Sequence, residues 1–301
     1  MNQSQSLKII YVGCLHFSLH CLKQLLANNA NVKAIFTLSS NKSNFHSDFS
    51  DLTPIAKKYE IPIHYIQNIN EPSTINRMQK YNPDVILVWG WSQILKEEIL
   101  KTPRLGCIGS HPTLLPQNRG RHPLIWPIVL GMKKSGLTFF WLEPGIDNGP
   151  ILAQKAFTIT NEDNAFTIYK KIECIASNLI PKFISQLAKG TAPRIIQNNN
   201  QATYWRKRDK RDGLIDFRMS SKDIDRLVRA LTKPYLGAHI EYLGKEIKIW
   251  KAKIGKLPED LGNVEPGKVI RTEARDIWVK AGDGSIILTK HEFFEIPPES
   301  A

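Results

Sequence analysis

The first half of the chain alternates short apolar runs with helix-like segments, and this alternation constrains the fold more than any other feature. Residues 7–13 and 84–89 read LKIIYVG and DVILVW, which are typical of buried strands. Residues 106–110 and 137–142 predict two more strands. Strands separated by helices pair in parallel through right-handed crossovers. We therefore expect an α/β fold with a parallel sheet that binds ligands at the carboxyl ends of its strands.

A long helix is predicted to begin after Thr160, which would form a capping box with Asp163, because apolar residues recur at helical spacing as far as Leu187. Pro181 falls inside this pattern, so we expect it to kink the helix or to start a second segment. Residues 191–203 are polar and rich in asparagine, and they predict a linker.

Beyond this stretch the pattern changes to short alternating strands. Residues 239–242 and 246–250 flank the turn-forming sequence LGK, and residues 276–280 and 285–289 flank GDG, so two hairpins are predicted. Short strands at this spacing indicate a small β-barrel. The predicted organisation is a catalytic domain, a linker and a β domain, with the bounds 1–190, 191–203 and 204–301.

The net charge of +13 fits anionic partners, among them RNA, sugar nucleotides and folate polyglutamates, and it equally fits lysines that only keep the protein soluble. The charge alone does not decide between these interpretations. The sequence has no apolar run of the roughly 20 residues that a membrane span needs, and its polar start lacks the features of a signal peptide. We expect a cytoplasmic protein without membrane contact. Its four cysteines form no CxxC pair, so we expect free thiols and no metal.

His111 and Asp147 are the candidate catalytic residues. His111 follows a predicted strand and is bracketed by proline-containing sequence, which would hold it at the ligand-binding edge of the sheet. Asp147 stands between two glycines in GIDNG, so it is expected on a tight turn. A histidine oriented by a carboxylate can transfer protons. A satisfied histidine and an ordinary turn are the alternative interpretation.

Residues 111–120 read HPTLLPQNRG and resemble the signature His-x-Ser-Leu-Leu-Pro-x-x-Arg-Gly of the folate-dependent formyltransferases, with Thr113 in place of serine. Residues 135–138 and 145–149 resemble that family's Thr-Gly-Val-Thr segment and its Gly-x-Asp-x-Gly turn. Residues 202–252 are similar to its second domain. Several ordered motifs at matching spacing are a stronger signal than one short match.

The resemblance implies a Rossmann-like N-terminal domain, an OB-like C-terminal β-barrel, and 10-formyltetrahydrofolate as the formyl donor. The acceptor amine would attack the formyl carbon and create a tetrahedral oxyanion. His111 would stabilise this oxyanion or shuttle protons, and Asp147 would set the charge of His111 and assist proton transfer from the amine.

The resemblance also implies a folate pocket in residues 88–94, VWGWSQI. Apolar rings there could flank the pterin while backbone groups bind its edge. For the two tryptophans, packing in the core is an equal alternative. The residues expected to contact folate are Val88, Trp89, Gly90, Trp91, Ile94, Leu142 and Ile146.

One position departs from the family's pattern. The family normally has an asparagine two residues before the histidine, where it donates to the oxyanion, and this chain has Gly109. Loss of such a donor costs on the order of a hundredfold or more in rate. Either another donor serves, with Ser110, Gln93, Asn118 and a backbone amide as candidates, or the protein is a weak or inactive catalyst.

Several acceptors fit the family. Residues 119–124, RGRHPL, resemble the enzyme that formylates UDP-4-amino-4-deoxyarabinose, so an amino-sugar nucleotide is the first expectation. Methionyl-tRNA is the second, although residues 39–51 contain only Lys42 where the tRNA enzymes carry a basic insertion. A deformylase, and a folate or nucleotide binder without catalysis, are further alternatives. The oligomeric state is left open, with a homodimer among the possibilities.

Overall fold

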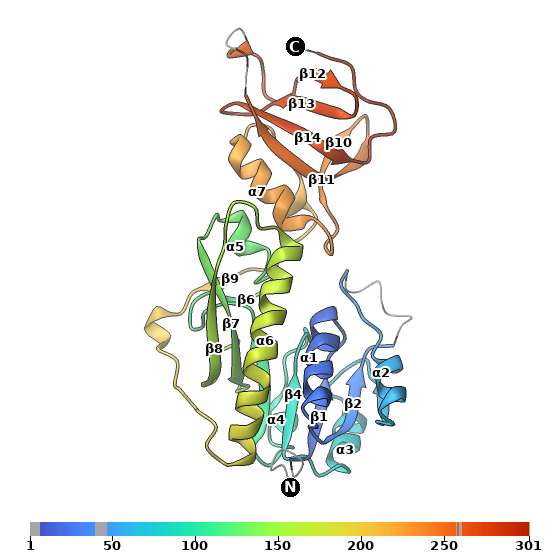
Figure 1. The fold of residues 1–301 in the computed structure, drawn as a ribbon, viewed down its shortest axis with the longest axis vertical. Coiled ribbons are helices and arrows are strands. Elements are labelled where there is room, and N and C mark those ends of the chain that lie inside the picture. The colour runs from blue at the N-terminus through green and yellow to red at the C-terminus, as the bar shows by residue number, and fades with distance from the viewer. Residues whose placement is uncertain (1–6, 40–46, 257, 259–260, 301) are drawn as a thin grey trace. The chain divides into compact units, whose positions relative to one another are not determined.

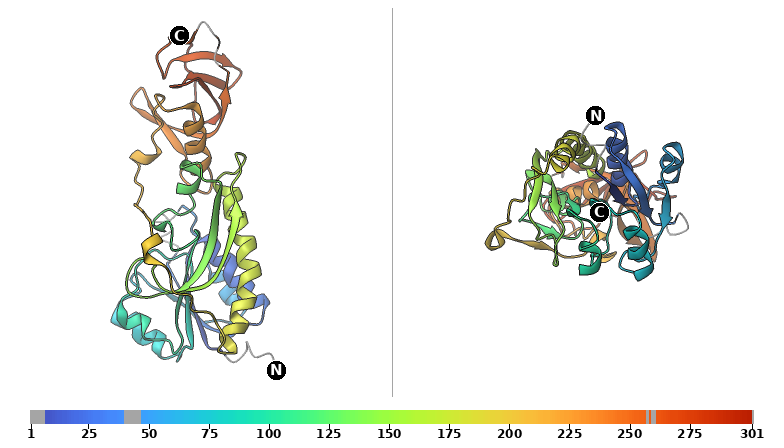
Figure 2. Two further views of the ribbon diagram at one scale, coloured as in Figure 1. Left: turned by 90° about the vertical axis from the view of Figure 1, so that its left-hand side faces the viewer. Right: turned by 90° about the horizontal axis from the view of Figure 1, so that it is seen from below.

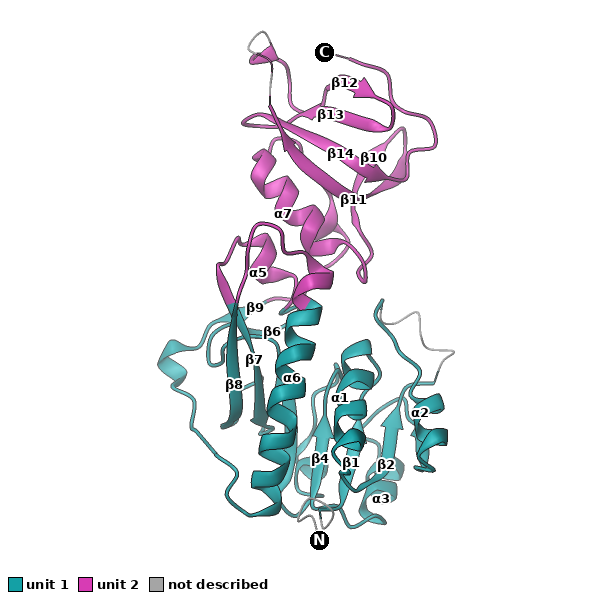
Figure 3. Ribbon diagram, in the orientation of Figure 1, with its two compact units in different colours: residues 1–123, 135–157, 169–205 teal, residues 124–134, 158–168, 206–301 magenta. Residues whose placement is uncertain are grey.

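The computed structural model describes residues 7–39, 47–256, 258 and 261–300. The chain forms two compact units, coloured separately in Figure 3. Unit 1 comprises residues 1–123, 135–157 and 169–205, and unit 2 comprises residues 124–134, 158–168 and 206–301. Residues 40–46, which include Lys42, lie outside the described residues.

A seven-stranded sheet forms the centre of unit 1 (Figure 1). Its strand order is β3-β2-β1-β4-β5-β7-β8. The first five strands in this order pair in parallel, and β7 runs antiparallel to β5. The strands are β1 (Ile9–Val12), β2 (Val32–Thr37), β3 (Ile63–Tyr65), β4 (Val85–Val88), β5 (Gly106–His111), β7 (Lys134–Trp141) and β8 (Ile151–Thr158).

Helices cover both faces of this sheet, as the two side views in Figures 1 and 2 show. Helix α1 (His16–Ala27) and helix α6 (Ala165–Ala188) lie side by side on one face, where His20 Nε2 and Ser177 Oγ are 2.8 Å apart. Helices α3 (Pro72–Gln79) and α4 (Glu97–Leu100) cover the other face. The short helix α2 (Thr53–Lys58) precedes β3.

Helix α6 continues through Pro181 from Ala165 to Ala188, so the proline does not start a second segment. A kink at Pro181 stays a prediction. The helix buries its apolar face on both sides of the proline, at Ala176, Ile180 and Phe183. This tertiary burial offsets the backbone hydrogen bond that a proline cannot donate. The helix also begins later than predicted, with Asn164 Oδ1 accepting from the amides of residues 166 and 167.

Unit 2 contains a five-stranded antiparallel sheet in the order β10-β11-β14-β13-β12. Both predicted hairpins are confirmed, as β10–β11 and β13–β14. Helix α7 (Ser221–Leu231) buries Ile224, Leu227 and Val228 in a common core with the sheet. The short helix α5 (Trp126–Val129) also belongs to this unit. The strands are β10 (Ala238–Tyr242), β11 (Lys245–Gly255), β12 (Val269–Glu273), β13 (Asp276–Lys280) and β14 (Ser285–His291).

The predicted fold class, α/β with a Rossmann-like N-terminal part and a separate C-terminal β part, is confirmed. The segment predicted as a linker, residues 191–203, lies within unit 1 and contacts other parts of it. Ile195 pairs with Ile151 in an isolated β-bridge, and η3 (Asn199–Gln201) follows. Strand β9 (Tyr204–Trp205) then pairs in parallel with β6 (Arg119–Gly120). The predicted domain bounds stay a prediction.

Candidate active site

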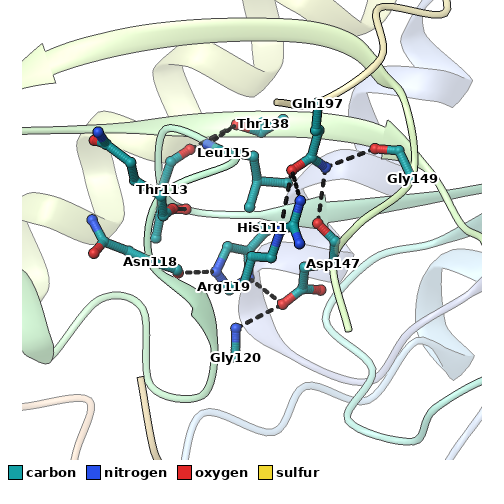
Figure 4. Close-up of polar contacts among 11 residues, drawn as sticks. His111, Thr113, Leu115, Asn118, Arg119, Gly120, Thr138, Asp147, Gly149 and Gln197 are labelled. Carbon is teal, nitrogen blue, oxygen red and sulfur yellow. Dashed lines mark hydrogen bonds and ion pairs between the residues drawn. The ribbon is translucent and has the colours of Figure 1, made fainter. Parts of the chain in front are cut away.

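His111 is the last residue of β5, at the carboxyl edge of the parallel part of the sheet. Its side chain is buried, and its Nε2 lies 2.8 Å from the carbonyl oxygen of Asn118 (Figure 4). A carbonyl oxygen only accepts hydrogen bonds, so Nε2 carries a proton. In the neutral ring this leaves Nδ1 with the free electron pair, ready to take up a proton.

Asp147 faces this free nitrogen. It lies in the loop between β7 and β8, and its Oδ2 is 3.6 Å from His111 Nδ1. The same oxygen accepts a hydrogen bond of 2.8 Å from the backbone amide of Gly120. A separation of 3.6 Å is an ion-pair distance and too long for a direct hydrogen bond. The carboxylate is therefore positioned to stabilise the ring when Nδ1 is protonated. The structure thus brings the two predicted catalytic residues together.

Residues 112–120 form a fixed loop that presents the Asn118 carbonyl to His111. Thr113 Oγ1 donates to Gln117 O at 3.1 Å, so the threonine keeps a hydroxyl where the family signature has serine. From β7, Thr138 Oγ1 donates to Thr113 O at 2.7 Å. From β8, Gln154 Nε2 donates to Leu115 O at 2.9 Å. Contacts from two neighbouring strands therefore hold the loop.

A second group of residues, which the sequence did not reveal, holds the backbone around Asp147. Arg119 is 2% exposed and donates to side-chain oxygens of Gln197, Asn199 and Tyr204. Gln197 in turn donates to the carbonyl oxygens of Asp147 and Gly149. Arg119 could have been noticed as the arginine of the Arg-Gly signature. Gln197 had no such signal, because it stands in a polar, asparagine-rich segment.

The predicted folate residues fall on two faces of the sheet. The Trp89 side chain is fully buried among Tyr11, Phe139 and Phe183, with ring centroids 5.1–6.0 Å apart. It therefore packs in the core on the α1/α6 side. Only its carbonyl, which accepts from Ser18 Oγ at 2.6 Å, borders the following turn, where Gly90 has a φ of +68°.

The other predicted folate residues lie toward the opposite face. Val88 is a buried member of the apolar cluster on the α3/α4 side, and half-buried Trp91 and Leu142 pack against the same cluster. The buried indole nitrogen of Trp91 has no hydrogen-bond partner among the described residues. Ile94 and Ile146 are 62% and 49% exposed. Segments that follow β4 and β7 thus meet on one apolar cluster.

Gly109 has the same strand parity as His111, so both side-chain positions lie on this face. A β-carbon on Gly109 would lie 2.6 Å from Leu142 Cδ2 and 3.2 Å from Phe140 Cε1. The place of the family's asparagine is therefore filled by Leu142.

Two of the substitute donors considered from the sequence are unsuitable. Ser110 points to the opposite face of the sheet because side chains alternate along a strand. Gln93 uses its side-chain oxygen for Ile69 N and its nitrogen for Gln67 O. Asn118 has its side-chain oxygen bound by Thr203 Oγ1 at 3.1 Å. The side-chain nitrogen of Asn118 and a backbone amide stay candidate oxyanion donors.

Within the described part of the chain, no helix is long and apolar enough to span a bilayer. The same residues contain no group of three or more His, Cys, Asp or Glu side chains that could hold a metal ion.

An imidazole paired with a carboxylate at the carboxyl edge of a parallel sheet is typical of α/β enzymes that transfer protons. Residues 7–184 match the model of the formyl transferase family, and residues 207–296 match the model of the formyl transferase C-terminal domain. The chain belongs to the formyl transferase family. The expectation of a formyltransferase with two family domains is therefore confirmed.

Curated relatives include enzymes with different names. The methionyl-tRNA formyltransferase of Alkaliphilus metalliredigens is 30% identical over 95% of this chain and 91% of its own length. The bifunctional polymyxin resistance protein ArnA of Wigglesworthia glossinidia brevipalpis is 34% identical over 86% of this chain and 39% of its own length.

Solved structures share the fold. HypX from Aquifex aeolicus in complex with tetrahydrofolic acid has a TM-score of 0.66 at 16% identity, covering 96% of this chain and 44% of HypX. The N-formyltransferase from Helicobacter canadensis in complex with folinic acid and dTDP-3-aminofucose has a TM-score of 0.67 at 20% identity, covering 94% of this chain and 98% of that protein.

Proposed function

We propose that this protein transfers the formyl group of 10-formyltetrahydrofolate to the amine of an amino-sugar nucleotide, with His111 and Asp147 as its catalytic residues. The observation that carries the proposal is the pairing of His111 Nδ1 with Asp147 Oδ2 at 3.6 Å, while Asn118 O fixes the proton on Nε2. We expect the reaction to take place in the cytoplasm.

In the proposed reaction the acceptor nitrogen attacks the formyl carbon and forms the new C–N bond. The bond from that carbon to N10 of the folate then breaks, leaving tetrahydrofolate and a formamide. The acceptor nitrogen loses one proton and N10 gains one, so the reaction has no net proton change. His111 and Asp147 carry the proton between these nitrogens, and the protonated ring stabilises the oxyanion of the tetrahedral intermediate.

The residues of the predicted pocket fit a folate. An apolar cluster with Trp91 and Leu142 at its edge and exposed Ile94 and Ile146 nearby supplies apolar surface for a heterocycle. The indole N–H of Trp91 is a donor without a partner among the described residues, and a heterocycle carbonyl could accept from it after a small side-chain movement. Contact with the pterin is proposed for these side chains and for the backbone of residues 88–90.

The acceptor is proposed on two grounds. The sequence RGRHPL at residues 119–124 is similar to amino-sugar formyltransferases, and the ArnA relative is 34% identical over 86% of this chain. Residues 39–51 also lack the basic insertion typical of tRNA enzymes.

Methionyl-tRNA is the second candidate acceptor. It is favoured by the methionyl-tRNA formyltransferase relatives, one of which is 30% identical over 95% of this chain, and by the net charge of +13. A basic protein attracts a polyanion such as tRNA through counterion release.

Tetrahydrofolate release tests the proposal. The purified protein is given 10-formyltetrahydrofolate with a panel of 4-amino and 3-amino sugar nucleotides, with methionyl-tRNA, or with no acceptor. Release that depends on a sugar nucleotide and is lost in His111→Ala supports the proposal. Release with tRNA alone favours the second candidate, and release without acceptor indicates a deformylase. Folate binding without release under any condition means that the protein is a binder and the proposal is wrong.

A further inference from the structure

Gln197 connects the candidate catalytic loop to a buried arginine. Its Nε2 donates to Asp147 O at 2.8 Å and to Gly149 O at 2.7 Å. Its Oε1 accepts from Arg119 Nη2 at 2.7 Å and from Nε at 3.2 Å. Figure 4 shows the amide lying between the guanidinium and the two carbonyl groups. The side chain is buried, so these contacts are shielded from solvent.

The partners of Gln197 fix the orientation of its amide. A guanidinium has no acceptor, so only Oε1 can face Arg119. A carbonyl oxygen has no donor, so only Nε2 can face Asp147 and Gly149. Both acceptor sites and both donor hydrogens are in use. A fully bonded, buried amide has one stable arrangement, and it therefore acts as a rigid link.

Arg119 is suited to anchor this link. Its remaining donors bind Tyr204 Oη at 2.9 Å and Asn199 Oδ1 at 2.8 Å. None of the ion pairs among the described residues includes Arg119, so neutral oxygens satisfy its charge. Its backbone amide also donates to Thr203 O at 2.9 Å, beside the pairing of β6 with β9. A buried charge needs such bonding, and the planar guanidinium then has little freedom to move.

Two neighbouring residues, Arg119 and Gly120, hold the backbone and the side chain of Asp147. Arg119 holds its carbonyl through Gln197, and the next residue, Gly120, donates directly to its carboxylate at 2.8 Å. The residue needs this support because its φ is +49°, a left-handed conformation that non-glycine residues rarely adopt. Such backbone persists where surrounding contacts determine it.

We propose that Gln197 is a positioning residue that sets the distance between the Asp147 carboxylate and His111 by holding the backbone of the catalytic loop. This inference rests on the proposed function of the His111–Asp147 pair. It assigns to the segment at residues 191–203 a part in catalysis, although no side chain of that segment touches His111 in the bonds described.

The variant Gln197→Glu tests the bonds to Asp147 and Gly149 separately from the bonds to Arg119. A glutamate keeps the oxygen that Arg119 binds, and it loses both hydrogens that hold Asp147 and Gly149. We expect kcat for formyl transfer to fall about 10- to 100-fold, because a displacement of about 1 Å in a catalytic group has effects of this size. KM for donor and acceptor should change less than about twofold. Gln201→Glu is the matched control, because Gln201 is an exposed residue of the same segment.

A double variant tests whether Gln197 acts through Asp147. In an Asp147→Asn background, Gln197→Glu should lower the single-turnover rate by less than about threefold, since the carboxylate that it positions is already gone. An equal loss in both backgrounds would overturn the inference, and so would a kcat like that of Gln201→Glu. If Gln197→Glu does not fold, Gln197→Asn replaces it, because it keeps the amide and shortens its reach.

A crystal structure of the variant keeps this inference distinct from the proposed function. If the wild-type protein transfers no formyl group to any acceptor, the proposed function fails. The positioning of Asp147 is then decided by the structure of Gln197→Glu alone. A carboxylate farther from His111 Nδ1 than 3.6 Å supports the inference, and an unchanged loop overturns it.

Discussion

Leu142 fills the space above Gly109, so closely that a β-carbon at residue 109 would lie 2.6 Å from Leu142 Cδ2. A side chain at residue 109 would therefore collide with Leu142, and the two positions form a steric pair. Residue 109 therefore supplies no side-chain donor to this face of the sheet.

Gly109→Asn is expected to destabilise the protein by about 1–3 kcal/mol without raising kcat, because Leu142 leaves no room for the side chain. Adding Leu142→Ala should open this space. The kcat of the double variant should then be about tenfold higher than that of Leu142→Ala alone, because the asparagine restores an oxyanion donor. Thermal melting and tetrahydrofolate release measure both effects. Ser110→Ala, on the opposite face, serves as the control. A stable Gly109→Asn variant with raised kcat would contradict the steric account.

His111→Gln should lower kcat by about 100- to 10,000-fold, the usual range for the loss of a general acid–base group. Glutamine can still donate to Asn118 O, so the fold of the 112–120 loop should be kept. Stopped-flow or steady-state tetrahydrofolate release gives the rate, and melting temperature checks the fold. A variant with near-wild-type turnover would exclude His111 from the proton transfer.

The two tryptophans should respond differently to substitution. Trp91→Leu should weaken binding of the folate by about tenfold, because it removes part of the wall of the proposed folate pocket. The melting temperature should change little. Trp89→Leu should instead cost about 2 kcal/mol of folding free energy, since its ring packs against Tyr11, Phe139 and Phe183 in the core. Titration with tetrahydrofolate and thermal melting distinguish the two roles. The reverse pattern would place the pocket on the other face.

Asp212 should make the stability of unit 2 depend on pH. Hydrogen bonding to Arg206 holds the pKa of its carboxyl well below its usual range, and the carboxylate also accepts from the amide of Asp209. A carboxyl whose pKa is lowered by folding stabilises the folded state. This stabilisation is complete at a pH above the pKa of the unfolded chain, about 4, and it is lost as the pH falls from there toward the pKa of the folded state.

Asp212→Asn should therefore cost about 1–2 kcal/mol at pH 7, with the difference from wild type shrinking below about pH 4. Denaturant unfolding at several pH values measures it. Asp216→Asn is a matched control, because that carboxyl pairs with Arg218 in solvent, where screening leaves little stabilisation, and a smaller change in stability is expected. A pH-independent difference for Asp212→Asn would contradict the ion-pair explanation.

The sequence predicted what depends on local pattern. Apolar runs identified β1 and β4, alternating patterns identified the two hairpins, and the signature around His111 identified the candidate site. The continuation of α6 through Pro181 could not be predicted locally, because it depends on tertiary burial of the apolar face of the helix, which offsets a missing hydrogen bond. Trp89 and Trp91 could not be distinguished, since residues two apart in a strand share a face and the two rings are separated only by the turn at Gly90, whose φ is +68°.

Gln197 was beyond any local argument. Its partners, Arg119 and Asp147, are 78 and 50 residues away in the sequence, and a glutamine in a polar segment carries no periodic signal. The steric pair of Gly109 and Leu142 was hidden for the same reason. The sequence showed a glycine where the family has an asparagine, but Leu142, which occupies the adjoining space, follows a different strand, β7.

Asp147→Asn tests the central claim most directly. The variant keeps the size and one oxygen of the side chain and removes the charge that faces His111 Nδ1. Acceptor-dependent formyl transfer should fall about 100-fold or more, while the dissociation constant for tetrahydrofolate stays within about twofold of wild type. Formyl transfer at the wild-type rate, or loss of folate binding in step with turnover, would contradict the proposed role of the pair.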